Sequence, residues 1–183
     1  NKFDKIRQTL IEDEYSGILR QDLQVIYVQG PPGAGKSRDI IERHGIEHVY
    51  RVLDYDASGK WDFYKPVVHD AVVLEEYQSS LKIGLLLDYA DIYPTRLSAR
   101  YADKVGTYHF LYIVSNWRLE EQYENVQSTS PETWKALLRR IRQVQVYNNG
   151  TVTTYTVEEY YKAIRAAKNT AAWLDDAEAA EEV

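Results

Sequence analysis

The chain has 183 residues, of which 44% are hydrophobic, and 22 Lys plus Arg stand against 28 Asp plus Glu, a formal net charge of -6. This length favours one compact domain, and the hydrophobic content excludes a wholly disordered or fibrous chain. No apolar run reaches the ~18 residues that a membrane span needs, and the absence of cysteine excludes disulfides, thiolate zinc sites and cysteine nucleophiles.

The ends of the chain carry two further signals. No secretory signal segment opens it and it contains no Met, so we expect an intracellular protein that is a piece of a longer one. The last nine residues hold five acids and no base, which predicts a solvated, flexible tail: Asp175, Asp176, Glu178, Glu181 and Glu182. The remaining 23 acidic residues nearly balance the 22 basic ones.

Hydrophobic periodicity and turn signals predict the elements of the first half. In chain order these are an amphipathic helix over the first twenty residues ending near Gly17 or Arg20, a strand at 23–29, a helix at about 36–44, strands near 47–53 and 70–74 around a polar aromatic loop, and a helix at 81–89.

In the second half, residues 96–111 alternate well enough for a hairpin that turns near Asp103 to Gly106. The elements expected next are a strand at 108–115, a helix capped by Ser130 with Pro131 in its first turn, strands at 143–147 and 151–155 around Asn148-Asn149-Gly150, and a helix from the Thr156/Glu159 capping box to about Trp173. Strands that alternate with helices indicate an α/β sheet with a parallel core.

One motif stands out between the strand at 23–29 and the next helix. It reads Gly30-Pro31-Pro32-Gly33-Ala34-Gly35-Lys36-Ser37 and fits the pattern Gly, four residues, Gly-Lys-Ser. Its glycines let backbone amides converge on phosphates, Lys36 adds a positive charge, and Ser37 is suited to ligate magnesium. The helix N-terminus that follows adds its dipole. We therefore expect a nucleotide to bind here together with Mg²⁺, although the motif does not identify the nucleotide.

Acidic and amide side chains follow two other apolar runs. Glu75 and Glu76 end Val72-Val73-Leu74, and we interpret Glu75 as the magnesium-side acid and Glu76 as the base that orients the attacking water. Asp88 also ends an apolar run, but its neighbours fit a helix and favour a surface position. Asn116 follows the strand at 108–115, from which it could reach the γ-phosphate and the water.

Basic residues cluster around the predicted hairpin, where acids are comparatively few. Arg100 and Lys104 belong to this cluster together with Lys82 and Arg96, and Tyr108 is one of the aromatic residues nearby. Bases of single-stranded DNA stack on such rings, so this region is the candidate DNA-binding surface.

The order of phosphate loop, acidic pair, basic hairpin and strand-ending Ser-Asn resembles the superfamily 3 helicase domain of rolling-circle replication initiators. It is most similar to the Rep proteins of circular single-stranded DNA viruses and related plasmids. The likeness covers about residues 24–147. It implies a P-loop, AAA+-like parallel-sheet core flanked by helices, with a helical oligomerisation segment at residues 1–21, a β-hairpin insertion, and a C-terminal strand, helix and acidic tail at 148–183.

This resemblance implies a ring, expected as a hexamer, with ATP between neighbours and hairpins around single-stranded DNA. Lys36 and Ser37 then serve Walker A, Glu75 and Glu76 Walker B, and Asn116 the sensor. Lys104, at the expected hairpin tip, matches the DNA-gripping lysine, and Arg139 or Arg140 matches the arginine finger, with Arg142 nearby.

The same resemblance also sets limits. Glu75 departs from the aspartate usual in the family, and the family's N-terminal origin-nicking endonuclease has no counterpart here. The implied compartment is the cytoplasm for a plasmid source or the host nucleus for a eukaryotic virus.

Two other functions fit the phosphate loop. A small P-loop kinase would transfer the γ-phosphate to a metabolite, with Arg139, Arg140 and Arg142 as its lid. A non-hydrolysing nucleotide switch would use the same loop for assembly. The helicase hypothesis differs from both in giving a role to Glu76 and to the basic hairpin.

Overall fold

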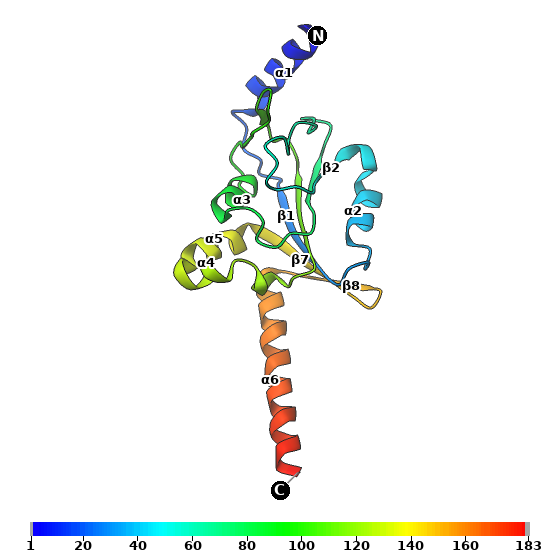
Figure 1. Ribbon diagram of the computed structural model, residues 1–183, viewed down its shortest axis with the longest axis vertical. Coiled ribbons are helices and arrows are strands. Elements are labelled where there is room, and N and C mark those ends of the chain that lie inside the picture. Colours follow the sequence, from blue (N-terminus) through cyan, green and yellow to red (C-terminus); the bar gives the residue numbers. More distant parts are fainter. Residues whose placement is uncertain (1, 182–183) are drawn as a thin grey trace.

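A six-stranded sheet forms the centre of the molecule in the computed structural model, which describes the backbone of residues 2–181 and the side chains of residues 2–171 (Figure 1). The strand order is β2-β3-β6-β1-β7-β8. All neighbours are parallel except β8, which runs antiparallel to β7. The strands are β1 (Gln24–Gln29), β2 (Val49–Val52), β3 (Ala71–Leu74), β6 (Phe110–Ser115), β7 (Ile141–Asn148) and β8 (Thr151–Tyr155). The predicted parallel core is confirmed.

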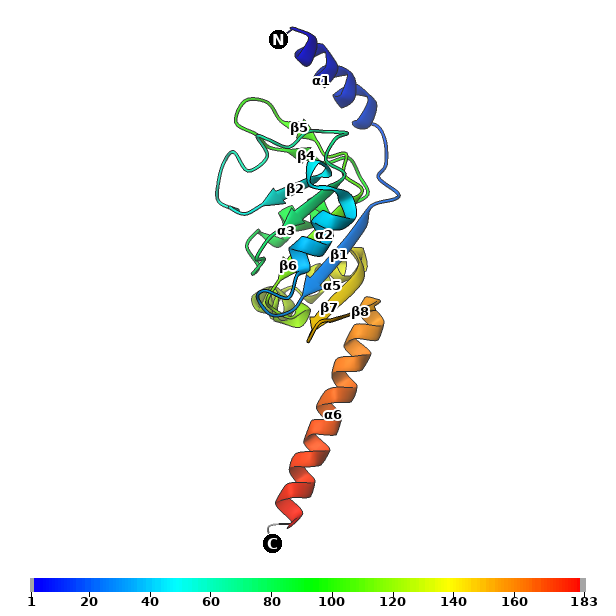
Figure 2. The same ribbon diagram turned by 90° about the vertical axis from the view of Figure 1, so that its right-hand side faces the viewer.

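Helices cover both faces of this sheet, as Figures 1 and 2 show. Residues of β1 alternate between the two faces: Ile26 and Val28 pack in one cluster with Ile40, whereas Val25 and Tyr27 belong to the other cluster. The first cluster includes α2 (Lys36–His44), and the second includes α3 (Ile83–Tyr89) and α5 (Pro131–Arg140). The near-continuous apolar character of β1, β3 and β6 follows from this two-sided burial.

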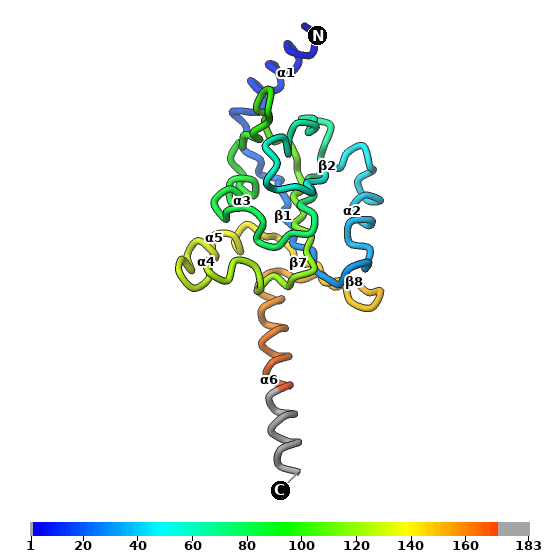
Figure 3. The backbone as a smooth tube through the Cα atoms, viewed as in Figure 1, coloured from blue at the N-terminus to red at the C-terminus, as the bar shows by residue number. Residues whose placement is uncertain are grey.

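Two helices extend away from the sheet. The first helix, α1 (Lys2–Tyr15), contains no buried residue. It ends before the expected end at Gly17 or Arg20. The last helix, α6 (Val157–Glu181), begins with the predicted capping box, in which Thr156 N–H donates to Glu159 and Glu159 N–H donates to Thr156 Oγ1. Figure 3 traces the chain from α1 through the core into α6.

The C-terminal segment is continuous with the central sheet. The boundary expected after residue 147 falls inside β7, and β8 continues the same sheet across the Asn149-Gly150 turn, where both residues have positive φ. The α6 helix continues to Glu181, past the expected end near Trp173. The acidic tail expected at 175–183 lies outside the residues whose side chains are described.

No helix in the described part combines the length and apolar character that crossing a bilayer requires.

The hairpin turns at a different place from the one predicted. Strands β4 (Arg96–Leu97) and β5 (Lys104–Val105) pair antiparallel with Leu97 opposite Lys104, so the turn is formed by residues 98–103. Lys104 therefore lies in a strand and not at the tip, because its ammonium donates to the carbonyls of Asp62 and Tyr64 and holds it within the ladder.

The sequence pattern missed α4 (Glu124–Thr129) and two single-turn 3₁₀ helices, Ile46–His48 and Leu119–Glu121. The polar sequence of α4 has no apolar period, and tertiary contacts fix its start: Tyr123 has a φ of 53° and its N–H donates to Ser79 Oγ at 2.7 Å.

A buried hydrogen-bond network around Gln122 joins this region to the sheet. Its Nε2 donates to Tyr27 Oη at 2.8 Å, to the Tyr77 carbonyl at 3.0 Å and to Ser115 Oγ at 3.1 Å. Its Oε1 accepts from both the N–H and the hydroxyl of Ser79. One side chain, 1% exposed, thus holds together the carboxyl ends of β1, β3 and β6.

We expect Gln122→Met to lower the free energy of unfolding by about 2–4 kcal/mol, because several buried polar groups lose their partner at about 1–3 kcal/mol each. Urea unfolding followed by circular dichroism measures the change. Gln78→Met is the matched control, since the Gln78 side chain is exposed, and should stay within about 0.5 kcal/mol of the wild type. Equal stability of the two variants would contradict a structural role for the network.

Candidate phosphate- and metal-binding site

The glycine-rich loop Gly30–Ser37 connects the end of β1 to the start of α2. Gly35 caps α2 with a φ of 92°, a left-handed conformation that favours glycine. Gly30 packs against β7 so closely that a Cβ there would lie 2.7 Å from both Cβ and the carbonyl oxygen of Tyr147. The loop therefore presents its amides and the amino end of α2 at one edge of the sheet, as an anion site requires.

Lys36 forms the floor of this site. Its side chain lies against the loop and donates to the Gly30 carbonyl at 2.6 Å, to the Pro31 carbonyl at 2.8 Å and to Asn116 Oδ1 at 2.9 Å. Burial lowers the pKa of Lys36, and the neighbouring carboxylates of Glu75 and Glu76 oppose that shift. The bond to Asn116 joins the loop to the residue that follows β6, so these two predicted site residues are in contact.

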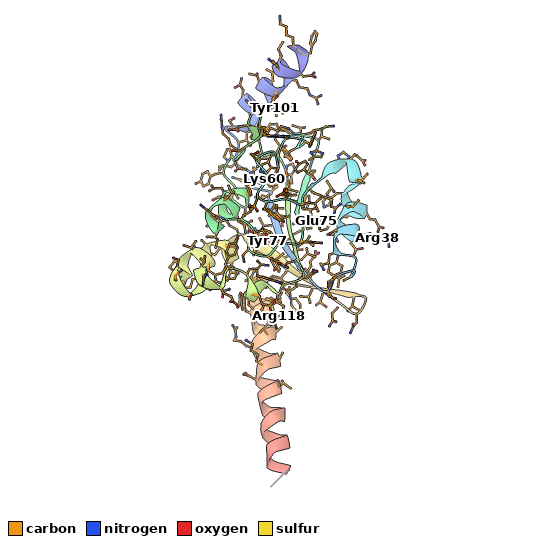
Figure 4. The ribbon with its side chains drawn as sticks, in the orientation of Figure 1. Arg38, Lys60, Glu75, Tyr77, Tyr101 and Arg118 are labelled. Atoms are coloured by element: carbon orange, nitrogen blue, oxygen red, sulfur yellow. The ribbon has the colours of Figure 1, made fainter. Side chains whose placement is uncertain are left out.

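Glu75 lies directly after β3 and points toward the start of α2. The Ser37 hydroxyl donates to Glu75 Oε2 at 2.6 Å, and Arg51 Nε donates to Oε1 at 2.7 Å. The Tyr55 hydroxyl donates to the backbone carbonyl of Glu75 at 2.6 Å. Figure 4 shows Glu75 in the interior, between the sheet and α2, with Arg38 on the outer side of that helix.

Glu76 differs from its neighbour in both exposure and conformation. Its φ of 48° breaks the alternation of β3, so the exposed Glu76 faces the same cleft as the buried Glu75. A positive φ at a glutamate is uncommon and costs free energy, which is typical of positions held by a functional arrangement.

These groups line one cleft of about 280 Å³. The structure brings together in it most of the loop, residues 32–37, and the predicted residues Glu75, Glu76 and Asn116. It also adds Arg38 and Arg51, which the sequence analysis did not identify. The signal for Arg51 was a charged residue in a strand position that shares its face with the buried Val49.

The donor set fits a magnesium ion in chemical type. The Ser37 hydroxyl and the Glu75 carboxylate are the hard oxygen donors that Mg²⁺ prefers, and phosphate oxygens and water commonly supply its other ligands. Among the residues that the structure describes, no group of three or more His, Cys, Asp or Glu side chains gathers to hold a metal. A metal at Ser37 and Glu75 would therefore depend on phosphate oxygens of a bound nucleotide.

The three candidate arginines lie at the opposite edge of the sheet. Arg140 and Arg142 flank Ile141, which pairs with Val25 at the start of β1. Val25 is five residues before Gly30, and at ~3.3 Å per residue this separates the arginines from the glycine-rich loop by roughly 16 Å. Arg140 is held in an ion pair with Asp91 at 2.6 Å, whereas Arg139 and Arg142 are exposed. None of them can form a lid over the loop of its own chain, which contradicts the lid expected for a kinase.

The candidate DNA-binding residues are already engaged within the protein. Lys104 binds two carbonyls, and Arg100 forms an ion pair with Asp62 at 2.5 Å. The N–H of Arg100 and then its guanidinium hold the pKa of Asp62 below its ordinary value.

The prediction that Tyr108 stacks on DNA bases is wrong. It is fully buried and donates to the Tyr89 carbonyl at 2.7 Å, while the Arg20 guanidinium lies 4.7 Å from its ring centre. The turn instead presents Tyr101, which is 91% exposed and lies at the end of the molecule near α1 (Figure 4). Asp88 is exposed on α3, as expected.

Comparison with known proteins identifies two relatives. The chain is 31% identical over 138 residues to the Replication-associated protein of Beak and feather disease virus, covering 71% of this chain and 40% of that protein. It is 28% identical over 95 residues to the Replication-associated protein of Human associated cyclovirus 1, covering 51% of this chain and 33% of that protein. No family model matches the chain.

The chain therefore shows weak homology to viral replication-associated proteins, which agrees with the predicted resemblance to Rep proteins. It spans less than half the length of the curated relatives it matches.

We expect Gly30→Ala to destabilise the protein by about 1–3 kcal/mol, because the added Cβ overlaps Tyr147 and forces the loop or β7 to move. Thermal unfolding measures the loss. Gly17→Ala serves as control, since nothing lies within 4 Å of a Cβ at that position. A Gly30→Ala variant as stable as Gly17→Ala would show that the loop does not rest on β7.

Proposed function

We propose that this chain is the ATP-dependent DNA helicase domain of a replication initiator, which hydrolyses ATP at subunit interfaces of a ring and unwinds duplex during rolling-circle replication. The observation that carries the proposal is the single cleft in which Lys36, Ser37, Glu75, Glu76 and Asn116 meet. The weak homology to viral replication-associated proteins supports the same function.

Each group has a role in this reaction. The loop amides and Lys36 bind the β- and γ-phosphates, and Asn116, already bonded to Lys36, contacts the γ-phosphate and the attacking water. Ser37 and Glu75 would hold Mg²⁺, which when bound neutralises charge that develops on the phosphates. The exposed Glu76 is free to orient water and accept its proton, a role for which the buried, bonded Glu75 is unsuited.

The position of the arginines supports hydrolysis between subunits. They lie at the sheet edge away from the loop of their own chain, so their charge can serve only the cleft of a neighbour. Arg140 is engaged by Asp91, which leaves the exposed Arg139, or Arg142 beside it, as the finger. A ring, expected as a hexamer, supplies the neighbour. The same geometry removes the lid on which the kinase hypothesis depended.

The decisive measurement is ATP hydrolysis by the chain, titrated with single-stranded DNA at several protein concentrations, with Lys36→Ala as control. We expect a rate per subunit that rises with both, because sites complete only between subunits and DNA promotes assembly. Strand displacement on a forked duplex then tests unwinding. A Lys36-dependent rate that responds to neither DNA nor protein concentration would contradict the ring helicase.

Mixing two inactive variants tests the shared site directly. Lys36→Ala removes phosphate binding and Arg139→Ala removes the finger. In a mixed ring, an interface that combines the intact loop of an Arg139→Ala subunit with the intact arginine of a Lys36→Ala subunit regains activity. We expect the mixture to recover part of the wild-type rate. Arg142→Ala mixed in the same way identifies the finger, and failure of both mixtures would show that neither arginine acts in trans.

For DNA contact, we expect Tyr101→Ala to weaken single-stranded DNA binding about 5- to 150-fold, the loss of one base stacked at ~1–3 kcal/mol. Fluorescence anisotropy with a labelled oligonucleotide measures it. Tyr93→Ala is the matched control, because Tyr93 is 64% exposed but precedes the base of the hairpin. Equal effects of the two changes would exclude the turn as the contact point.

A further inference from the structure

The carboxylate of Glu75 is fully engaged by protein groups. One oxygen accepts from Ser37 at 2.6 Å and the other from Arg51 at 2.7 Å, and the side chain is 5% exposed. A carboxylate removed from water in this way is stable only with a compensating charge or hydrogen bonds. Arg51 supplies the compensating charge.

The sheet register explains why Arg51 can do so. Arg51 pairs with Val73 across β2 and β3, and Glu75 comes two residues after Val73, so both side chains project from the same face of the sheet. That face is the one that α2 covers, with Ser37 in its first turn. The ion pair thus lies on the wall of the cleft, where Ser37 and Glu75 are the candidate metal ligands.

Other cations near the cleft have different partners. Lys36 donates to two carbonyls and to Asn116, and Arg38 forms an ion pair with Glu42 on the outer side of α2. Among the described residues, Arg51 is the cation that is hydrogen-bonded to Glu75. Its side chain is 43% exposed, which leaves it room to turn toward the cleft.

We propose that Arg51 is an internal counter-ion that competes with the divalent cation for Glu75 and so sets how much Mg²⁺ the site requires. This inference rests on the proposed function. A divalent ion between Ser37 and Glu75 would stand close to the guanidinium, and the two positive charges repel each other. The guanidinium is then released toward the phosphates of the bound nucleotide, which are equally good partners for it. Arg51 is therefore a positioning residue that links metal binding to nucleotide binding.

The test is a MgCl₂ titration of binding of a fluorescent ADP analogue, which needs no hydrolysis. We expect Arg51→Met to lower the MgCl₂ midpoint about tenfold, the effect of one unit charge on a divalent ion roughly 6 Å away at water-like dielectric. Arg51→Lys keeps the charge and should titrate like the wild type. Arg38→Met is the control for loss of charge: it removes a positive charge from the rim of the same cleft but leaves Glu75 paired, so its midpoint should move much less than that of Arg51→Met.

A second measurement uses no nucleotide. Without Mg²⁺, Arg51→Met should melt at a lower temperature than Arg38→Met, because Glu75 loses its counter-ion. If Arg51→Met fails to fold, Arg51→Gln retains a hydrogen-bond donor without the charge and should show the same lower midpoint.

The outcomes separate two failures. A midpoint for Arg51→Met that is unchanged or higher than that of the wild type, while wild-type binding is Mg²⁺-dependent, overturns the competition. In that case Arg51 either does not affect the metal or holds Glu75 in the position from which Glu75 binds the metal. A wild-type chain that binds the analogue neither with nor without Mg²⁺ would instead overturn the proposed function, and this inference with it.

Discussion

The burial of a carboxylate at the end of a central strand is the constraint on which the rest of the site depends. Glu75 is removed from water by α2 and the sheet. Two separate segments compensate its carboxylate, Ser37 from α2 and Arg51 from β2, while Tyr55 from the loop after β2 donates to its backbone carbonyl. Because these contacts converge, the position of the glycine-rich loop is tied to that of β2 and β3. A displacement of α2 or β2 would leave the carboxylate partly unpaired, which is costly in a buried place.

The carboxyl edge of the sheet is held from the opposite face as well. Gln122 joins residues at the carboxyl ends of β1, β3 and β6, among them Ser115, the last residue of β6 and the neighbour of Asn116. One face of this edge therefore presents charged groups to a cleft, while the other closes over a network of neutral hydrogen bonds. A fixed edge of this kind favours pre-organisation of the cleft, because charged side chains that meet a phosphate gain most when they do not have to reorganise.

Local sequence patterns predicted the parts of the fold that local physics determines. The apolar runs of β1, β3 and β6 indicate strands buried on both faces, the loop pattern places Lys36 and Ser37 at a helix start, and Thr156 with Glu159 marks the start of α6. The same patterns placed the acidic pair and Asn116 at strand ends, so their meeting in one cleft followed from the parallel order.

Other features depend on contacts between distant segments, which a single sequence does not display. The turn of the hairpin was misplaced because Lys104 is held by carbonyls some forty residues earlier in the chain. Tyr108 has the composition of a stacking residue, yet its ring fills the core under Arg20. The pairing of Arg51 with Glu75 could be found only through the register that sets Arg51 beside Val73. In each case the deciding partner is remote in sequence and adjacent in space.

The charged groups of the candidate site are divided between the two edges of the sheet at which the parallel strands begin and end. One edge holds the cleft with its buried acid and glycine-rich loop, and the other carries the exposed Arg139 and Arg142. Because Ile141 begins its strand beside Val25 while the loop begins at Gly30, the length of β1 keeps these edges apart within one chain. If the cleft edge of each copy faces the arginine edge of the next copy, every cleft lies beside the arginines of a neighbour. Repetition of that contact forms a closed ring when the rotations from copy to copy add up to a full turn. If hydrolysis takes place between subunits, as proposed, the length of the central strand of the parallel sheet is what makes it depend on assembly.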